Sequence, residues 1–188
     1  MADSFLTVKT TVGIDPGSIN CGWGVLEKTG SSVRFVAAGT IAMPKQKPLA
    51  ERLKILHEGL TGIFSRFRPD SAAVEDVFYG KNVKAAFVLG HARGVALAVA
   101  ALAGVPVIEY SPTTVKKAVT GYGRAEKEQV QKMISAILGI RDTLLPDSAD
   151  ALSVALCHIN TADLAGLTGL AATDPRLRTA RIFSKRSR

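Results

Sequence analysis

Apolar and polar positions divide the first third of the chain into three short apolar runs and one long periodic segment. Residues 8–14, 22–27 and 33–41 have the apolar, β-branched character of strands, with a turn predicted at residues 28–32. Leucine, isoleucine and phenylalanine then recur at steps of three and four over residues 49–67, which predicts an amphipathic helix. The pattern therefore predicts a three-stranded meander followed by a helix.

The remaining residues alternate short apolar runs with longer helical segments. Strands are expected over residues 71–78 and 105–110, and helices over 84–103, from Pro112, over 126–138 and from Asp147. The inner face of the helix over 126–138 is expected to hold Val130, Met133, Ile134, Ile137 and Leu138. This order predicts an α/β fold, a mixed five-stranded sheet with helices on both faces, in which reacting groups collect at strand ends.

Size and charge refine this picture. A chain of 188 residues, 47% of them hydrophobic, can bury one full core, and we expect a domain over residues 1–160 followed by a flexible basic tail over 161–188. The net charge of +8 indicates a polyanionic partner. Six Lys and Arg, and no acid, lie between Arg176 and Arg188, so the tail fits either a nucleic-acid contact or a solubilising chain end.

Nothing in the sequence predicts export or a membrane. The longest uncharged run, residues 94–108, is too short to cross a bilayer, and Asp3 stands where a secretory signal would need basic residues. We therefore expect a cytoplasmic protein with no membrane partner. Cys21 and Cys157 lack the spacing of a disulfide framework or a zinc site, which predicts two reduced thiols in the core.

Four carboxylates stand at positions that need an explanation. Asp15 ends the first predicted strand, Glu75 lies in the fourth, and Asp147 and Asp150 lie three residues apart at the start of the last helix. A carboxylate in apolar surroundings is costly unless a cation compensates it. Four oxygen ligands without His or Cys suit Mg²⁺ or Mn²⁺, and a pair of such ions is typical of phosphodiester hydrolysis.

Each acid also has an ordinary interpretation. Asp147 alone would be a helix cap, and Asp150 alone a first-turn acid favoured by the helix dipole. Glu75 could be a paired strand residue, with Asp76 on the opposite face in solvent. The glycines that follow Asp15, namely Gly17, Gly22 and Gly24, are interpreted as room for a phosphate backbone and for a tight hairpin turn.

Five blocks of the sequence resemble the bacterial RuvC family of Holliday-junction resolvases, in the same order and at the same spacing. They are GIDPGSINCGWGV, VEDVFYGKN, LGHARGVAL, YSPTTVKKAVTGYGRAEKEQVQ and LPDSADALSVALCH. The resemblance implies an RNase H-like fold, a homodimer, Mg²⁺ dependence, and an endodeoxyribonuclease that makes paired symmetric nicks across a four-way DNA junction in recombination and repair. It also implies a branch-migration partner, the RuvA–RuvB complex.

The resemblance assigns roles to residues one by one. Asp15, Glu75, Asp147 and Asp150 match the metal-binding carboxylates, and Phe78 matches an aromatic residue that stacks on unpaired bases. Lys116 and Lys127 match basic residues near the scissile phosphate, with Lys127 also counted as catalytic. Lesser candidates for DNA contact are Arg124, Lys81, Lys84 and Arg93. The chain departs from the family at Asp76, which would weaken DNA affinity, and at His91, which we take as structural.

The implied mechanism uses two Mg²⁺ ions, for which Mn²⁺ should substitute, and leaves a 5′-phosphate. The helix that begins near Lys84 is the candidate dimer contact, because small residues let helices approach closely. The sequence leaves two alternative functions open. One is an actin-like or sugar-kinase-like ATPase, which would need a second similar domain, and the other is a junction-binding module without catalysis, which would bind a polyanion better without four acids.

Overall fold

One mixed sheet of five strands, in the order β3-β2-β1-β4-β5, organises the molecule. The computed structural model describes residues 7–76 and 83–168, except for the side chains of residues 83–85 and 163–168. An antiparallel meander forms one half of the sheet, and β4 and β5 extend it in parallel from β1. The strands are β1 (Val8–Pro16), β2 (Asn20–Thr29), β3 (Ser32–Ala42), β4 (Ser71–Glu75) and β5 (Val107–Tyr110).

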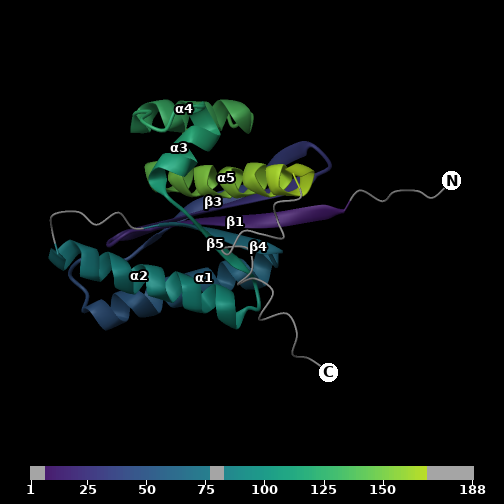
Figure 1. The fold of residues 1–188 in the computed structure, drawn as a ribbon. Helices are drawn as coiled ribbons and strands as arrows, with labels where there is room; N and C mark the ends of the chain where they lie inside the picture. Colours follow the sequence, from purple (N-terminus) through teal and green to yellow (C-terminus); the bar gives the residue numbers. More distant parts are fainter. Residues whose placement is uncertain (1–6, 77–82, 169–188) are drawn as a thin grey trace, which may run out of the picture.

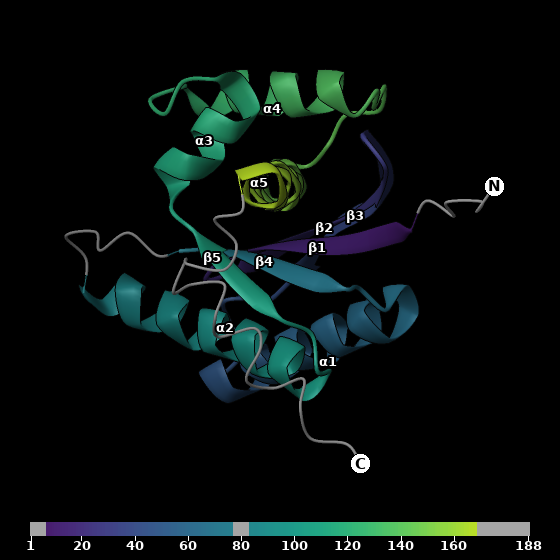
Figure 2. The same cartoon turned by 45° about the vertical axis from the view of Figure 1, so that its right-hand side comes forward.

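Helices cover both faces of this sheet (Figure 1). The pair α1 (Leu49–Phe67) and α2 (Val83–Leu102) lies on one face, and α5 (Pro146–Thr168) lies on the other. Two shorter helices, α3 (Pro112–Thr120) and α4 (Lys127–Ile137), lie over α5 on the side away from the sheet (Figure 2). The predicted mixed five-stranded α/β fold with helices on both faces is confirmed.

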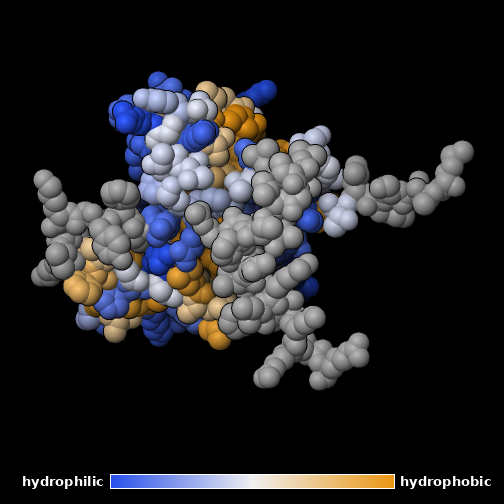
Figure 3. Space-filling model, viewed as in Figure 1, coloured by the Kyte–Doolittle hydropathy of each residue, from blue (hydrophilic) through white to orange (hydrophobic). Residues whose placement is uncertain are grey.

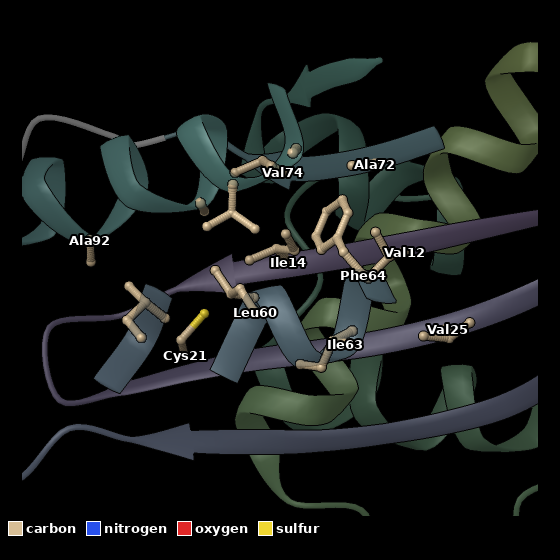
Figure 4. Close-up of a cluster of buried hydrophobic side chains, with 14 of the residues drawn as sticks. Val12, Ile14, Cys21, Val25, Leu60, Ile63, Phe64, Ala72, Val74 and Ala92 are labelled. Carbon is tan, nitrogen blue, oxygen red and sulfur yellow. The ribbon is translucent and has the colours of Figure 1, made fainter. Parts of the chain in front are cut away.

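The core has one layer on each side of the sheet. Ile14 and Val74 pack against Leu60 and Phe64 of α1 on the face shown in Figure 4. This confirms the amphipathic pattern predicted for residues 49–67. On the opposite face α5 packs on the sheet and α3 and α4 pack on α5, and the buried side chains there include Leu26, Ile134 and Leu152.

The prediction for the inner face of α4 is partly wrong. Val130 and Ile134 are buried, and Leu138 is half-buried against the same cluster. Met133 and Ile137, which the periodicity assigned to the inner face, are exposed. In the described structure α4 packs mainly on the neighbouring helices α3 and α5 rather than on the sheet, so it buries a narrower stripe than its apolar positions suggest.

The glycines of β1 and β2 lie directly against α5. Their interpretation as room for a phosphate backbone is therefore wrong. A Cβ atom at Gly24 would lie 2.6 Å from the Leu152 side chain, and one at Gly13 would lie 2.7 Å from the backbone nitrogen of Ala155. Gly22 faces the start of the same helix. Only Gly17 has the turn role that was expected, since a Cβ there would collide with the backbone of Asn20 in the β1–β2 hairpin.

Both cysteines are buried and free, as predicted. Within the described ranges, no helix has the length and hydropathy that a membrane crossing requires. The boundary predicted at residue 160 falls inside α5, which continues to Thr168. Residues 169–188, which include most of the predicted tail, lie outside the described residues.

Candidate active site

Asp15 and Glu75 meet at one edge of the sheet. The strands that carry them, β1 and β4, are parallel neighbours, and their last paired residues are Ile14 and Val74, one position before each acid. The two carboxyl groups share a side-chain hydrogen bond. The parallel pairing of β1 with β4 therefore places the two acids side by side.

The N-terminal end of α5 brings the other two acids to the same place. Asp147 and Asp150 both interact electrostatically with Asp15. The helix start is held over the sheet by a contact of 3.3 Å between the hydroxyl oxygens of Ser148 and Thr40. The four carboxylates that the sequence singled out thus form one cluster, built from β1, β4 and α5.

Burial and mutual repulsion make this cluster hard to ionise. Desolvation, followed by the charges of Asp150 and Asp147, raises the pKa of Asp15 to about 6. Desolvation, followed by the charge of Asp15, raises the pKa of Glu75 to about 8. Near neutral pH the carboxyl group of Glu75 therefore keeps its proton, and it donates the hydrogen bond to the carboxylate of Asp15.

Among the described residues, Lys127 is the basic residue that forms an ion pair with the cluster. It is the first residue of α4, and its Nζ lies 2.6 Å from Oδ2 of Asp150. This hydrogen bond raises the pKa of the lysine, and its positive charge lowers the pKa of both Asp15 and Glu75. The lysine matched to the scissile phosphate by the family resemblance is thus placed at the carboxylate cluster.

The cluster fits a hard divalent cation by its donor atoms and by its charge. All four candidate ligands are carboxylates. The negative charges of their neighbours raise the pKa of Asp15 and of Glu75, and a bound cation would relieve this repulsion. Across residues 7–76 and 83–168, no three His, Cys, Asp or Glu side chains already have an arrangement that could hold a metal ion. Three of the four acids are instead engaged within the protein, Asp150 with Lys127, and Asp15 and Glu75 with each other. A metal would replace the shared proton and compete with the ammonium group.

The raised pKa of Glu75 predicts how the metal-free protein responds to pH. Its folded form binds a proton more tightly than the unfolded chain, so the stabilisation is complete below the unfolded pKa of 4.5 and is lost as pH rises towards about 8. Burial lowers the pKa of His158 to about 4. This histidine therefore makes the protein less stable only below pH 6.5, its ordinary pKa, and has no effect at higher pH. Between pH 6.5 and 8 in EDTA, we therefore expect the melting temperature of the wild type to fall with rising pH.

The Glu75→Gln variant isolates this contribution. An amide cannot titrate, so its melting temperature in EDTA should change less with pH over the same range. Thermal melts at half-unit pH intervals make the comparison, with Glu128→Gln on the exposed side of α4 as the control. Equal pH slopes for the wild type and Glu75→Gln would show that Glu75 is ionised at neutral pH.

The structure describes only some of the residues that were predicted to contact DNA. Lys116 is half-buried on α3, and Arg124 is exposed on the α3–α4 loop. In Figure 3 hydrophilic side chains gather over the left part of the layer that holds α3 and α4, and apolar surface lies at its right. Phe78 and Lys81 lie outside the described residues, and the side chain of Lys84 is also not described. These five residues remain predictions.

Arg93 has partners within the protein. Its guanidinium forms ion pairs with Glu109 and, at 3.4 Å, with Asp76. DNA contact by Arg93 would therefore require exchange of these bonds, and the negative charge of Asp76 is partly compensated. The ring nitrogen Nδ1 of His91 lies 2.6 Å from the carbonyl oxygen of Phe87, one helical turn earlier, which is consistent with a structural role.

Three residues contribute to the site in ways that sequence reasoning missed. Thr40 and Ser148 hold the start of α5, and Gly22 lies beneath it. No motif marks the two hydroxyl residues, because either could be an ordinary surface or helix-cap residue. Gly22 was noticed but was assigned to the phosphate backbone.

Comparison with known proteins agrees with this geometry. Residues 11–158 match the family model described as "Crossover junction endodeoxyribonuclease RuvC". A protein of that name from Chloroflexus aggregans is 51% identical over 152 residues, which is 80% of this chain and 93% of the relative. Another, from Trichlorobacter lovleyi, is 46% identical over 165 residues, 88% of this chain and 93% of the relative.

Solved structures show the same likeness in three dimensions. RuvC of Thermus thermophilus, solved in complex with a Holliday junction substrate, superposes with a TM-score of 0.79 at 36% identity, covering 84% of this chain and 96% of that one. The yeast mitochondrial Holliday junction resolvase has a TM-score of 0.62 at 15% identity, over 90% of this chain and 86% of its own, a likeness of fold alone. The expected RNase H-like fold is confirmed.

Proposed function

Because the chain belongs to the RuvC family of crossover junction endodeoxyribonucleases, we propose that it resolves four-way DNA junctions by paired, symmetric nicks during homologous recombination and repair. It is an endonuclease that hydrolyses DNA, and its family is metal-dependent. The observation that carries the proposal is the cluster of four carboxylates at the sheet edge, with Lys127 in contact with it. Membership in this family rules out the alternative of an actin-like or sugar-kinase-like ATPase.

Asp15, Glu75, Asp147 and Asp150 are the proposed metal ligands, and Mg²⁺ is the proposed ion, with two per site and Mn²⁺ as a substitute. Bound there, the ions would supply charge stabilisation at the scissile phosphate and its 3′-oxygen. Glu75 must release its proton before it can serve as a ligand. Lys127 leaves Asp150 and places its ammonium group against a phosphate oxygen, where it stabilises the developing negative charge.

Cleavage of a synthetic four-way junction tests the proposal. The wild type with Mg²⁺ should nick two opposed strands at symmetric positions, leave 5′-phosphates that a ligase can seal, and leave a linear duplex of the same sequence intact. EDTA should abolish the nicks. Junction binding without cleavage in either Mg²⁺ or Mn²⁺ would instead support a non-catalytic binding module.

A homodimer accounts for paired nicks, because two sites related by a two-fold axis match the symmetry of the junction. The helix α2 supports this proposal, since it is apolar on nearly all sides and covers the sheet with only one of them. Gly90, Gly94 and Ala98 are exposed at intervals of four residues, and a Cβ atom at either glycine would meet nothing within 4 Å. Figure 3 shows apolar surface over the layer that holds α1 and α2.

Ala98→Glu should break such a dimer. Burying an unpaired carboxylate costs about 3–5 kcal/mol, which corresponds to about a hundredfold or more in the dimer constant. Light scattering over a concentration series measures the change, and junction cleavage should shift from paired to single nicks. The matched control is Ala136→Glu on the exposed side of α4. A wild-type dimer constant for Ala98→Glu would remove α2 from the interface.

The remaining DNA contacts are proposed from sequence and charge. Phe78 is the proposed stacking residue at the opened crossover, and Lys116, Arg124, Lys81 and Lys84 are proposed phosphate contacts. The basic tail would add to the salt dependence of junction binding. We also propose that the enzyme acts in the cytoplasm, together with the RuvA–RuvB branch-migration complex.

A further inference from the structure

We propose that Gly22 is a positioning residue of the active site, because the absence of a side chain at this position lets Asp147 approach Asp15. The inference rests on the proposed metal-dependent nuclease function. It concerns the backbone at the start of α5, where Asp147 lies in the first turn and Asp150 follows three residues later. Gly22 itself touches neither metal nor DNA.

The sheet places Gly22 directly beside Asp15. The pairing of β1 with β2 sets Asp15 opposite Gly22, and the pairing of β2 with β3 sets Gly22 opposite Thr40. Residues paired in this way across adjacent strands point to the same face of the sheet. Asp15, Gly22 and Thr40 therefore form one row across the sheet, on the face that α5 covers (Figure 2).

The first turn of α5 lies on this row. A Cβ atom built on Gly22 would overlap the carbonyl oxygen of Asp147 and would lie 2.5 Å from its carbonyl carbon. At the next position in the row, the Ser148 hydroxyl meets that of Thr40. The row thus meets the backbone of Asp147 at Gly22 and the side chain of Ser148, the next residue, at Thr40. These two contacts would set the distance between the carboxylate of Asp147 and that of Asp15.

The obstacle at Gly22 differs in kind from that at Gly24. A Cβ atom at Gly24 would first meet the Leu152 side chain, at 2.6 Å and 2.7 Å, and only then a backbone atom, the nitrogen of Leu152 at 3.1 Å. A side chain can change its rotamer. At Gly22 the nearest atoms belong to the backbone of a metal-ligand residue, which can yield only if the helix start moves. A side chain at position 22 would therefore displace a carboxylate, whereas one at position 24 would chiefly disturb packing.

The test is Gly22→Ala, with Gly24→Ala as the matched control on the same strand and face. We expect both variants to melt at lower temperature. Mn²⁺ titration followed by electron paramagnetic resonance should show affinity reduced about tenfold or more in Gly22→Ala only, and junction cleavage reduced about a hundredfold, as expected for a displacement of about 1 Å at a catalytic centre. Junction binding in EDTA should be unchanged.

Rescue by a longer side chain separates positioning from loss of stability. Asp147→Glu extends the carboxylate by one bond of about 1.5 Å, so it should weaken Mn²⁺ binding in the wild type yet restore part of it in Gly22→Ala. If Gly22→Ala does not fold, Thr40→Val releases Ser148 without adding volume and should weaken Mn²⁺ binding several-fold.

The outcomes are distinguishable. Wild-type Mn²⁺ affinity in folded Gly22→Ala, or in Thr40→Val where Gly22→Ala does not fold, would overturn the positioning role, as would additive effects of Gly22→Ala and Asp147→Glu. A wild type that neither binds Mn²⁺ nor cuts junctions would contradict the proposed function itself.

Discussion

Asp15→Asn is expected to bind a four-way junction as tightly as the wild type and to nick it about a thousandfold more slowly, the upper range for loss of one electrostatic group at an active site. The carboxylate of Asp15 interacts with each of the other three acids, Glu75, Asp147 and Asp150. The amide keeps the size of the side chain but removes the charge that a metal requires. Gel-shift titration in EDTA and single-turnover cleavage in Mg²⁺ measure the two properties separately.

The control for Asp15→Asn is Asp142→Asn, which makes the same chemical change at an exposed position. It should cleave at the wild-type rate. Cleavage by Asp15→Asn within tenfold of the wild-type rate would remove Asp15 from the metal site. A parallel loss of junction affinity would instead mean that the substitution disturbs the fold or the DNA-binding surface.

Lys127→Ala is expected to lower cleavage by about a hundredfold and to move the activity to higher pH. The ammonium group of Lys127 lowers the pKa of both Asp15 and Glu75. Its removal lets these pKa values rise further, so a higher pH is needed to ionise the carboxylates. The rising limb of the pH–rate profile should therefore shift in the alkaline direction, measured by single-turnover cleavage between pH 6 and 9.

Two further variants test whether this shift comes from the positive charge of Lys127. Lys127→Arg keeps the positive charge and should restore the wild-type position of the rising limb, although its rate should remain lower because a guanidinium differs in shape and hydrogen bonding. Lys132→Ala removes an exposed lysine from the same helix and should leave the profile unchanged. An alanine variant of Lys127 with a lower rate but an unshifted profile would show that the lysine acts on the phosphate alone.

The order of elements and the four acids were predictable because each leaves a local signal. A carboxylate beside Ile14 at the end of an apolar strand, or in the buried strand that holds Val74, is conspicuous in one sequence. The amphipathic period of α1 likewise follows from local spacing. Parallel pairing of β1 with β4 then follows from topology, and it brings Asp15 to Glu75.

What could not be predicted depends on contacts between residues far apart in the chain. Gly22 looks like a turn or ligand-binding glycine until the backbone of Asp147 is seen above it. Arg93 looks like a DNA contact until its ion pairs with Asp76 and Glu109 are seen. No local pattern specifies such partners, since the same glycine or arginine would suit several environments.

Mn²⁺ binding to the wild type, Asp15→Asn and Asp142→Asn is the decisive measurement for the carboxylate site. Titration at pH 8, close to the pKa of about 8 of Glu75, should show saturable binding to the wild type and to Asp142→Asn, and a loss of that binding in Asp15→Asn. Equal Mn²⁺ affinity in all three proteins would contradict the assignment of the metal to the cluster of Asp15, Glu75, Asp147 and Asp150.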